Sequence, residues 1–491
     1  MSPQASPTLL ELAMQNLLRK EALAISALED LPGELFPRLF KAAFVNRQTD
    51  ILKAMVQVWP FPCLPLGALM KTKTVHTETL QDKVVPMETL QVILDGLDLL
   101  LAEKTRPRRC KLQVLDLRSE HQNFWKVWAE NTADICSAEA KSRKQAQQTR
   151  PGMGTKQPLQ VFVDVHLTQR VLDPFFNIFV WAEERKGLLQ LSCKRLKIST
   201  VTIQRATKAL GLLDLGCVQE VEVQCTWKLA TLAAFAPYLG QMKSLRRFFL
   251  SHVQVPVSIS PEEKEQFVTQ FASQFLNLSC LQELFLASAS FLEGCLAQML
   301  RCLKAPLDAL SITDCQLLQS DLDDLSQCPS IHQLKHLNLS GVQLTHFSPD
   351  PLRVLLERVA ATLQTLDLEG CRIEDSQLSA LLPALCRCVQ LTTFNYLKNS
   401  VSVEGLEHLL RHTARLSRLS LEMYSVPWEI YRVQGAGHRR RLEQLRDELR
   451  RTVVLLGHHK TIWFSIIPCP PYERRAIHEP ELRQLQDYNP A

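Results

Sequence analysis

The sequence predicts an α/β solenoid, because one pattern of apolar residues recurs at a nearly constant interval and the composition suits a large buried core. The spacing L-x-x-L-x-L-x-x-(N/C)-x-L returns from residue 218 onward, most clearly in LDALSITDCQL (307–317) and LQTLDLEGCRI (363–373). The predicted copies begin at residues 218, 245, 281, 307, 334, 363, 391 and 416, with steps of 27, 36, 26, 27, 29, 28 and 25. Self-similarity at one interval is the signature of a repeat architecture.

The pattern is that of leucine-rich repeats, in which each copy supplies one strand and one helix. The alternating L-x-L predicts a short strand, and the Asn or Cys at the ninth position is expected to bond the backbone where the chain turns away. The residues between copies are typical of helices: in HFSPDPLRVLLERVAATL, Leu352, Leu355, Leu356 and Val359 share one face. Parallel strands stack about 4.8 Å apart whereas helices need about 10 Å, so we expect a curved horseshoe with strands on the concave face and helices on the convex face.

The remaining segments complete the predicted domain organisation. Residues 1–100 are expected to form a helical N-terminal cap, and residues 101–190 the first irregular repeats, near Leu112 and Leu188, with a mobile loop near 130–158. The basic run SRKQAQQTR in that loop is interpreted as solvated, with a nucleic-acid contact as the alternative. The regular repeats span residues 191–430. In the C-terminal cap, 431–491, Leu442, Leu445 and Leu449 share a helical face, and TIWFSII is predicted to add a last strand.

Charge and cysteine usage favour a protein of the cytosol or nucleus, and the lack of catalytic motifs favours a non-catalytic one. The charge of +5, from 56 Lys and Arg against 51 Asp and Glu, is spread along the chain and favours neither a nucleic-acid nor a membrane partner. Fifteen cysteines, an odd number set mostly in apolar runs, indicate free thiols in a reducing compartment, and the N-terminus lacks a signal peptide. Because no phosphate loop, nucleophile elbow or metal-ligand spacing is found, we expect no enzyme, cofactor, metal site or small-molecule substrate.

The N-terminal segment has the pattern of a docking helix. Thr8 and Glu11 form a capping box that predicts a helix from Leu9 to about Glu29. On it the spacing T-L-x-x-x-A-x-x-x-L resembles the BC box, by which substrate receptors hold elongin C. The predicted elongin C-binding residues are Leu9, Ala13 and Leu17. The BC box usually has Cys where this chain has Ala13, and the smaller side chain fills the same pocket less completely.

A second docking pattern follows directly. Residues Leu31, Pro32, Leu35 and Leu39 are spaced as in a cullin-2 box and are the predicted cullin-binding residues. The same spacing returns in Phe36, Pro37, Phe40 and Phe44. A proline suits a helix start, and the i, i+4 spacing predicts an apolar docking ridge.

Two alternatives to a cullin-2 box remain open. The run Leu31-Pro32-Gly33-Glu34-Leu35 also resembles the opening of an F-box, with Trp59 downstream, which would imply Skp1 and cullin-1. Two amphipathic helices that merely cap the first repeat would show the same spacing.

The concave face supplies candidate client-binding residues, since strand side chains alternate between the two faces with period two. Of these, Phe249 and Phe285 are the candidate binding hot spots. The full set is Arg247, Phe249, Glu283, Phe285, His336, Asn338, Thr365, Asp367, Thr393, Asn395, Arg418 and Ser420.

Long phrases in the same order along the chain resemble the PRAME (preferentially expressed antigen in melanoma) family over nearly the full length. They include LRKEALAISALEDLPGELFPRLFKAAF, LKAMVQVWPFPCLPLGALMK and CTWKLATLAAFAPYLGQMKSLRRFFLSH. The resemblance implies a leucine-rich horseshoe and a substrate receptor for a ligase of cullin-2, elongin B and elongin C. It also implies germline or embryonic roles that restrain differentiation, apoptosis and transcription. Some members have a cysteine-rich tail, whereas here Cys469 stands alone near the C-terminus.

A transcriptional co-regulator, or a repeat scaffold without a ligase, is the alternative function. Four L-x-x-L-L sequences fit nuclear-receptor motifs, at 97–101, 352–356, 378–382 and 406–410. The last three fall in predicted repeat helices, where the leucines are expected to face the core. Only the first, outside the regular array, supports this alternative.

Overall fold

A computed structural model describes residues 8–70, 87–103, 105–118, 158–168, 174–199, 201–429 and 461–465, with single positions at 125, 444, 447, 448 and 451. The predicted loop at 130–158 and the predicted cap helix with Leu442, Leu445 and Leu449 lie outside the described residues, except for Pro158 at the loop's end. The chain divides into two compact units. Unit 1 comprises Met1–His166, Arg170–Lys194 and Lys208–Asp214, and unit 2 comprises Leu167–Gln169, Arg195–Thr207 and Leu215–Ala491.

Unit 1 begins with helices and continues into short strands. Its helices are α1 (Leu9–Arg19), α2 (Glu21–Ala27), α3 (Phe36–Val45), α4 (Thr49–Gln57), α5 (Gly67–Met70), α6 (Met87–Ala102) and α9 (Pro174–Glu184). Its strands are β1 (Cys63–Pro65), β2 (Val114–Asp116) and β5 (Leu213–Asp214), together with β3 (Leu159–Leu167) up to His166, and β4 (Leu189–Ser199) spans both units. Strand β2 lies between β1 and β3 and is parallel to both, so the predicted irregular repeat near Leu112 does contribute a strand.

An aromatic cluster forms the centre of the helical part. The Trp59 ring meets Phe36 and Phe40 edge-on, at centroid distances of 5.6 and 5.1 Å, and Phe40 stacks on Trp125 at 5.8 Å. Both indole N–H groups donate to backbone carbonyls, of Cys63 and Pro65, at 2.9 Å. Buried indoles need such acceptors, so the cluster anchors β1 to the helices.

Unit 2 is a regular parallel solenoid. Its strands are β6 (Glu220–Gln224), β7 (Arg247–Ser251), β8 (Glu283–Ala287), β9 (Ala309–Thr313), β10 (His336–Asn338), β11 (Thr365–Asp367), β12 (Thr393–Tyr396), β13 (Leu421–Ser425) and β14 (Thr461–Ser465). The helices between them are α11 (Leu229–Leu239), α12 (Pro261–Ala272), α13 (Leu296–Arg301), α14 (Gln319–Gln327), α15 (Asp350–Val359), α16 (Asp375–Leu385) and α17 (Val403–Thr413), and α10 (Ile203–Leu210) spans both units.

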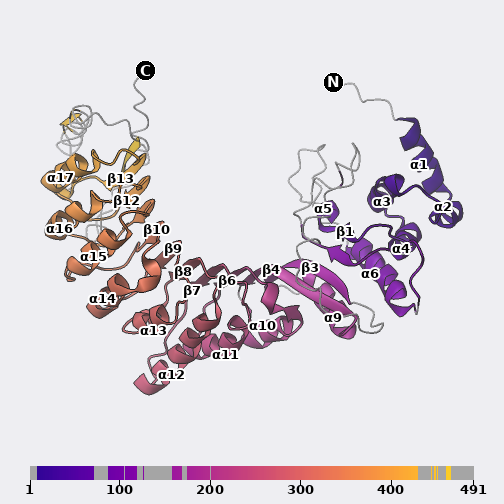
Figure 1. The fold of residues 1–491 in the computed structure, drawn as a ribbon, viewed down its shortest axis with the longest axis horizontal. Helices are drawn as coiled ribbons and strands as arrows, with labels where there is room; N and C mark the ends of the chain where they lie inside the picture. The colour runs from indigo at the N-terminus through magenta and orange to yellow at the C-terminus, as the bar shows by residue number, and fades with distance from the viewer. Residues whose placement is uncertain are drawn as a thin grey trace, which may run out of the picture. The chain divides into compact units, whose positions relative to one another are not determined.

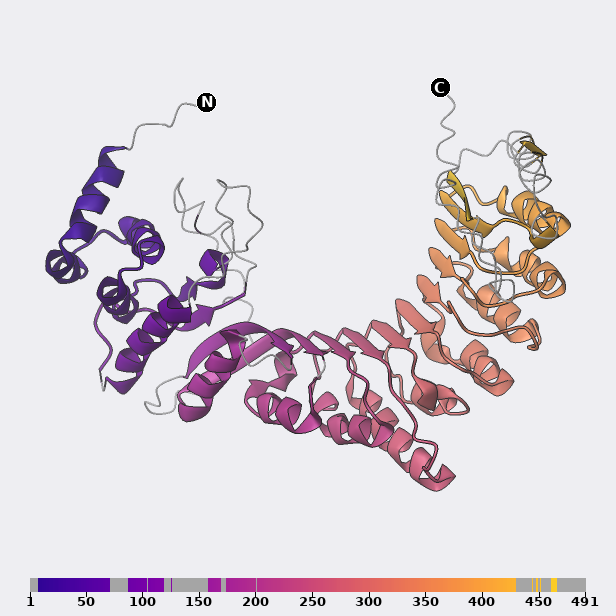
Figure 2. The same cartoon turned by 180° about the vertical axis from the view of Figure 1, so that it is seen from behind.

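Each strand of unit 2 pairs in parallel with the next, and β14 is the last strand that TIWFSII predicts. Within this unit the strands follow the inner side of a curve and the helices the outer side (Figures 1 and 2). The predicted α/β leucine-rich-repeat solenoid is confirmed. None of the helices in the described ranges is long and apolar enough to cross a membrane.

The strand register tests the predicted repeat frame. Leu310 aligns with Leu337, which aligns with Leu366, and all three are buried. The last copy differs, because Thr393 pairs with Leu421, so this copy begins at Leu419 and not at Leu416.

A buried glutamate explains the shifted frame. Glu422 occupies the position of a core leucine and is 0% exposed. Its carboxylate accepts hydrogen bonds from the hydroxyl of Tyr424 at 2.6 Å and of Thr413 at 3.1 Å. A polar group is tolerated in a core when it is hydrogen-bonded, and the spacing of leucines alone does not show that Thr413 and Tyr424 supply these bonds.

The ninth repeat position bonds the backbone as predicted. The Sγ of Cys371 donates to the carbonyl of Leu339 at 3.1 Å, and the amide of Asn399 donates to the carbonyl of Leu368 at 2.8 Å. Burial raises the pKa of both Cys315, to about 11, and Cys371. Every cysteine within the described ranges is a free thiol, as predicted.

A left-handed residue follows each of six successive strands, a regularity that the sequence pattern does not indicate. Only two of the six are glycines, and the set is His252, Ser288, Asp314, Gly341, Gly370 and Lys398. The chain therefore leaves each of these six strands, β7 to β12, through a left-handed residue, whatever the residue type at that position.

Candidate interaction surfaces

Helix α1 keeps an apolar side in solvent. Its capping box is present: the Thr8 hydroxyl accepts from the Glu11 N–H at 3.3 Å, and the Glu11 carboxylate accepts from the Thr8 N–H at 2.7 Å. The side chain of Leu9 is 85% exposed, Ala13 is exposed and Leu17 is partly exposed. Of the three predicted elongin C-binding residues, Leu9 and Ala13 thus lie at the surface and Leu17 is partly covered.

The exposed apolar surface is larger than the sequence analysis proposed. Leu12 is 48% exposed, and on α2 the side chains of Leu23 and Ile25 are 53% and 37% exposed. The predicted continuous helix to Glu29 is wrong, because Lys20 leaves the helical region at φ −110° and ψ 76° and separates α1 from α2. No glycine or proline marks that break, so propensity alone could not reveal it. We call Leu9, Leu12 and Ala13, which share one side of α1, the apolar patch, whereas Leu23 and Ile25 are two residues apart on α2 and do not share a face.

The predicted cullin-binding segment is partly at the surface. Pro32 is exposed, Leu31 and Leu35 are partly exposed, and Leu39 is only 1% exposed. Leu39 therefore serves the core in this conformation and offers no docking surface. The repeated pattern is buried as well, with Phe36 and Phe40 at 0% exposure, since α3 turns its apolar side towards the aromatic cluster.

Arg109 fixes this segment in a way that the sequence analysis missed. Its guanidinium donates to the carbonyl of Leu28 at 2.8 Å and also to those of Glu29 and Leu31. It lies over the ring of Phe36, with 5.3 Å to the centroid. Five donors in a rigid fork suit a backbone turn, so Arg109 holds the segment before Pro32 in one conformation.

The L-x-x-L-L sequences are not presented to a partner. In the three repeat helices the leucines are buried as predicted, for example Leu406, Leu409 and Leu410 at 0%. The expectation that 97–101 differs is wrong, because Leu97 and Leu100 are 0% and 2% exposed where α6 packs on α4.

The concave candidates lie on the predicted strands with two exceptions. Arg418 and Ser420 are exposed but precede β13, and the register places Leu421 and Met423 in their positions. Asn395 is on the predicted face but is only 6% exposed. The other members lie on β7, β8, β10, β11 and β12 and are partly or fully exposed: Arg247, Phe249, Glu283, Phe285, His336, Asn338, Thr365, Asp367 and Thr393.

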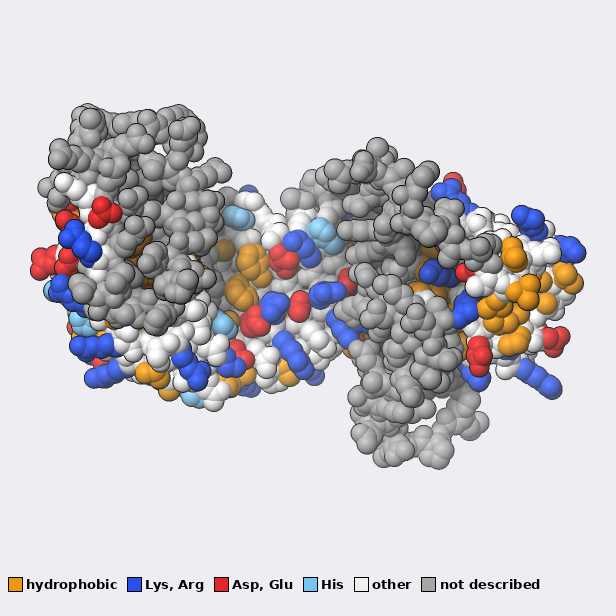
Figure 3. Space-filling model, turned by 90° about the horizontal axis from the view of Figure 1, so that it is seen from above, with side chains coloured by type: hydrophobic (Ala, Val, Ile, Leu, Met, Phe, Trp, Pro, Cys, Tyr) orange, Lys and Arg blue, Asp and Glu red, His pale blue; other side chains and the backbone are white. Residues whose placement is uncertain are grey.

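The charges on the first strands of this face neutralise one another. Arg247 forms a two-point pair with Glu283, at 2.7 and 3.0 Å, and also lies 3.8 Å from Glu220. Lys197 pairs with Glu222 at 3.0 Å. Acidic and basic side chains intermingle on the strand side, beside an apolar area (Figure 3). The rings of Phe249 and Phe285 lie 6.4 Å apart in that neighbourhood.

A hollow of about 270 Å³ lies over the following strands. It is lined by Phe285, Ala309, Leu310, Ser311, His336, Leu337, Asn338, Thr365, Leu366, Asp367, Thr393, Asn395 and Met423. Short side chains on β9, of Ala309 and Ser311, leave this space beside the larger Phe285.

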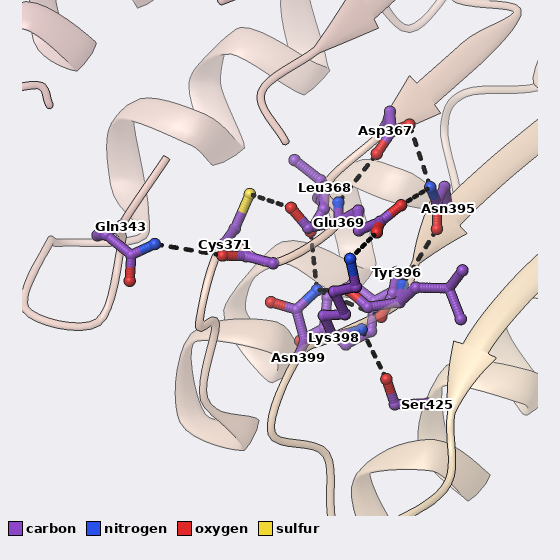
Figure 4. A network of polar contacts seen from close by, with 12 residues as sticks. Gln343, Asp367, Leu368, Glu369, Cys371, Asn395, Tyr396, Lys398, Asn399 and Ser425 are labelled. Carbon is purple, nitrogen blue, oxygen red and sulfur yellow. Dashed lines mark hydrogen bonds and ion pairs between the residues drawn. The ribbon is translucent and has the colours of Figure 1, made fainter. Parts of the chain in front are cut away.

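A polar network includes Asp367 and Asn395 of the hollow's lining and continues to Glu369 and Lys398 (Figure 4). The Asp367 carboxylate accepts from the Glu369 N–H at 2.9 Å and from the Asn395 amide at 3.1 Å. That amide also donates to Glu369 at 3.0 Å, and Lys398 pairs with Glu369 at 2.9 Å. Burial raises the pKa of Asp367, whereas the hydrogen bonds from Lys398 and Asn395 outweigh burial and lower the pKa of Glu369. The pKa values of these two neighbouring carboxylates are thus shifted in opposite directions.

Known proteins are similar to this chain over nearly its full length. The PRAME N-terminal domain matches residues 6–125, and the PRAME C-terminal domain matches residues 159–485. PRAME family member 12 of Homo sapiens is 52% identical over 482 residues, covering 98% of this chain and 97% of the relative. Human PRAME family member 8 is 50% identical, with 98% and 99% covered, and member 19 is 44% identical, with 96% of each covered.

Among solved structures, an internalin of Listeria monocytogenes is 14% identical, with a TM-score of 0.29, and covers 55% of this chain and 72% of its own. Since both domains match and several relatives are 44–52% identical over almost all of both sequences, this chain belongs to the PRAME family.

Proposed function

We propose that this chain is the non-catalytic substrate-recognition subunit of a ubiquitin ligase of cullin-2, elongin B and elongin C. The observation that carries the proposal is the exposed apolar side of α1, where a BC-box-like spacing coincides with an 85% exposed leucine. In this arrangement α1 would bind elongin C, the segment at Leu31 and Pro32 would select the cullin, and the concave face of unit 2 would hold a client.

The apolar patch has the chemistry of a helix that binds in a groove. Burying one leucine side chain contributes roughly 1.5–3 kcal/mol, and Leu9 gains almost none of this in the free chain. Apolar anchors on one side of a helix are the usual means of docking into a groove. Because the capping box already fixes the start of α1, binding would cost less ordering than the folding of a loose segment.

The choice of cullin rests on a smaller surface. Only Leu31, Pro32 and Leu35 of the four predicted residues are available, and Arg109 holds the backbone that precedes them. The same residues fit the opening of an F-box, so Skp1 with cullin-1 is the alternative assembly. We place the protein in the cytosol or nucleus, and any restraint of differentiation, apoptosis or transcription would follow from the client that it recruits.

Single aspartates on α1 are expected to abolish capture of elongin C. The full chain should retain purified elongin B–elongin C in a pulldown, and Leu9→Asp and Ala13→Asp should each reduce retention at least about tenfold, since a charge buried in an apolar groove costs several kcal/mol. Both sites are exposed, so folding should persist, and at Leu9 an acid in the first turn also favours the helix. Gln15→Asp, at an exposed position elsewhere around the helix, is the matched control and should bind normally.

The same assay separates the alternatives. Cullin-2 retained together with elongin C would support the receptor role, and Pro32→Asp should then release cullin-2 but not elongin C. Retention of Skp1 and cullin-1 in place of elongin C would favour the F-box assembly. Retention of neither pair by a folded chain would overturn the ligase proposal and favour a repeat scaffold.

A further inference from the structure

One residue per strand forms a row across the concave face of unit 2. The strand register aligns Phe249, Phe285, Ser311, Asn338, Asp367, Asn395 and Met423 on β7 to β13. The four residues from Ser311 to Asn395 are short and polar, and we call them the polar trough. Aromatic rings border it on the side of β8, and Met423 borders it on the side of β13.

The polar trough contains a carboxylate that lacks a cationic partner. Asp367 accepts hydrogen bonds from two neutral donors, but no basic nitrogen of the described residues lies within 4.0 Å of it. The other carboxylates of this face differ, because Glu222 pairs with Lys197, Glu283 with Arg247 and Glu369 with Lys398. Glu220 also lies 3.8 Å from Arg247, so Asp367 differs from all of these carboxylates in having no basic nitrogen of the described residues within 4.0 Å.

We propose that the polar trough binds an extended peptide segment of a client protein that places a lysine or arginine against Asp367 and a large apolar side chain against Phe285. The hollow supplies space over the same residues. Asp367 is half-buried, and a charge-assisted hydrogen bond is strongest where water is partly excluded. The two partly exposed rings offer apolar area next to the trough, where an apolar side chain would lose its contact with water.

The spacing of the strands sets the expected sequence motif. Phe285 and Asp367 lie on β8 and β11, three strand steps apart, which is about 14 Å at roughly 4.8 Å per step. An extended peptide lying across the strands advances about 3.4 Å per residue and turns alternate side chains to the same side. The apolar residue and the basic residue should therefore be four positions apart, with a small or polar residue midway, above Ser311 and Asn338.

This inference deepens the proposed receptor role, but it can be tested without any ligase subunit. The folded full chain would be used to select from a phage-displayed library of random heptapeptides. We expect enrichment of peptides with a large apolar residue four positions from a lysine or arginine. Two outcomes would overturn the proposal even if elongin C were captured. One is equal enrichment of acidic peptides, and the other is enrichment of peptides in which the apolar and basic residues have no fixed spacing.

A double-mutant cycle then tests the contact itself. The most enriched peptide would be labelled and its Kd measured by fluorescence anisotropy, with norleucine replacing its basic residue in a second peptide. On the unaltered chain this replacement should weaken binding at least about tenfold, which is about 1.4 kcal/mol. On Asp367→Asn it should have little further effect, because the charged partner is already absent.

Matched variants guard against a general effect. Asp314→Asn removes one exposed carboxylate outside the hollow, at a left-handed position that asparagine tolerates, and should leave the Kd within about twofold. Phe285→Ala should weaken the peptide at least about tenfold without changing its preference for a basic residue. If Asp367→Asn unfolds, the norleucine peptide on the unaltered chain still decides, since equal affinity for both peptides would refute the contact.

Discussion

Replacing Gly67 with alanine is expected to destabilise unit 1 by at least about 3 kcal/mol, at the upper end of the cost of overpacking a core. Gly67 is buried at the start of α5, and a Cβ there would lie 2.1 Å from the carbonyl oxygen of Leu117 and 2.4 Å from that of Arg118. These are backbone atoms beside β2, so they cannot move away as the end of a flexible side chain could. The thermal unfolding midpoint of the full chain, with limited proteolysis to locate the loosened region, would measure the effect.

Gly33 provides the control for this prediction. A Cβ on Gly33 would meet nothing within 4 Å, and its backbone is not in the left-handed region. Gly33→Ala should therefore leave the midpoint unchanged or raise it slightly, since alanine restricts the unfolded chain. Equal midpoints for Gly67→Ala and Gly33→Ala would show that the close approach of Gly67 to β2 is incorrect.

Replacing Asn399 with alanine is expected to destabilise unit 2 by about 3 kcal/mol, because one buried side chain satisfies backbone groups of two repeats. Its amide donates to the carbonyls of Leu368, Tyr396 and Leu397 at 2.8, 3.2 and 3.2 Å, and its carbonyl accepts from the N–H of Ile373 at 3.1 Å. Alanine would leave these groups buried without partners, at about 1–3 kcal/mol for each group left unsatisfied. Urea unfolding would measure the loss.

Hydrogen exchange adds a local readout to that experiment. The amide of Ile373 should lose protection first in Asn399→Ala, because its acceptor is removed. Gln343→Ala is the control, because this exposed side chain also donates to two backbone carbonyls, at 3.1 and 3.4 Å. Water can replace the Gln343 amide there, so the free energy of unfolding should change by no more than about 0.5 kcal/mol. Unchanged protection at Ile373 would contradict the structural role of Asn399.

The sequence was most informative where one rule is repeated many times. Leucines such as Leu310, Leu337 and Leu366 return at a fixed interval, and each must be buried against its neighbours, so the solenoid and its strand frame were predictable. The predicted frame was wrong at Leu416, because a leucine pattern can begin either there or at Leu419. In the pattern that begins at Leu419, Glu422 takes a core position. This is possible only because folding brings the hydroxyl groups of Thr413 and Tyr424 to its carboxylate.

The docking residues show the same division. The spacing of Leu9, Ala13, Leu17 and of Leu31, Pro32, Leu35, Leu39 indicated apolar helix faces, and a core face has the same spacing as a binding face. Tertiary packing distinguished them, since among the described residues Leu39 lies within the core at 1% exposure whereas Leu9 stays 85% exposed.

By itself the sequence determined the repeat architecture, the capped start of α1 and the concave positions of Phe285 and Asp367, because periodicity and capping are local properties of the chain. Only the tertiary structure decided which apolar residues stay exposed and which carboxylate lacks a cation. The interactions of Asp367 span from β11 to the next repeat, at Asn395, 28 residues away in the chain. Such contacts depend on which residues the stacking of repeats brings together, and no local pattern encodes them.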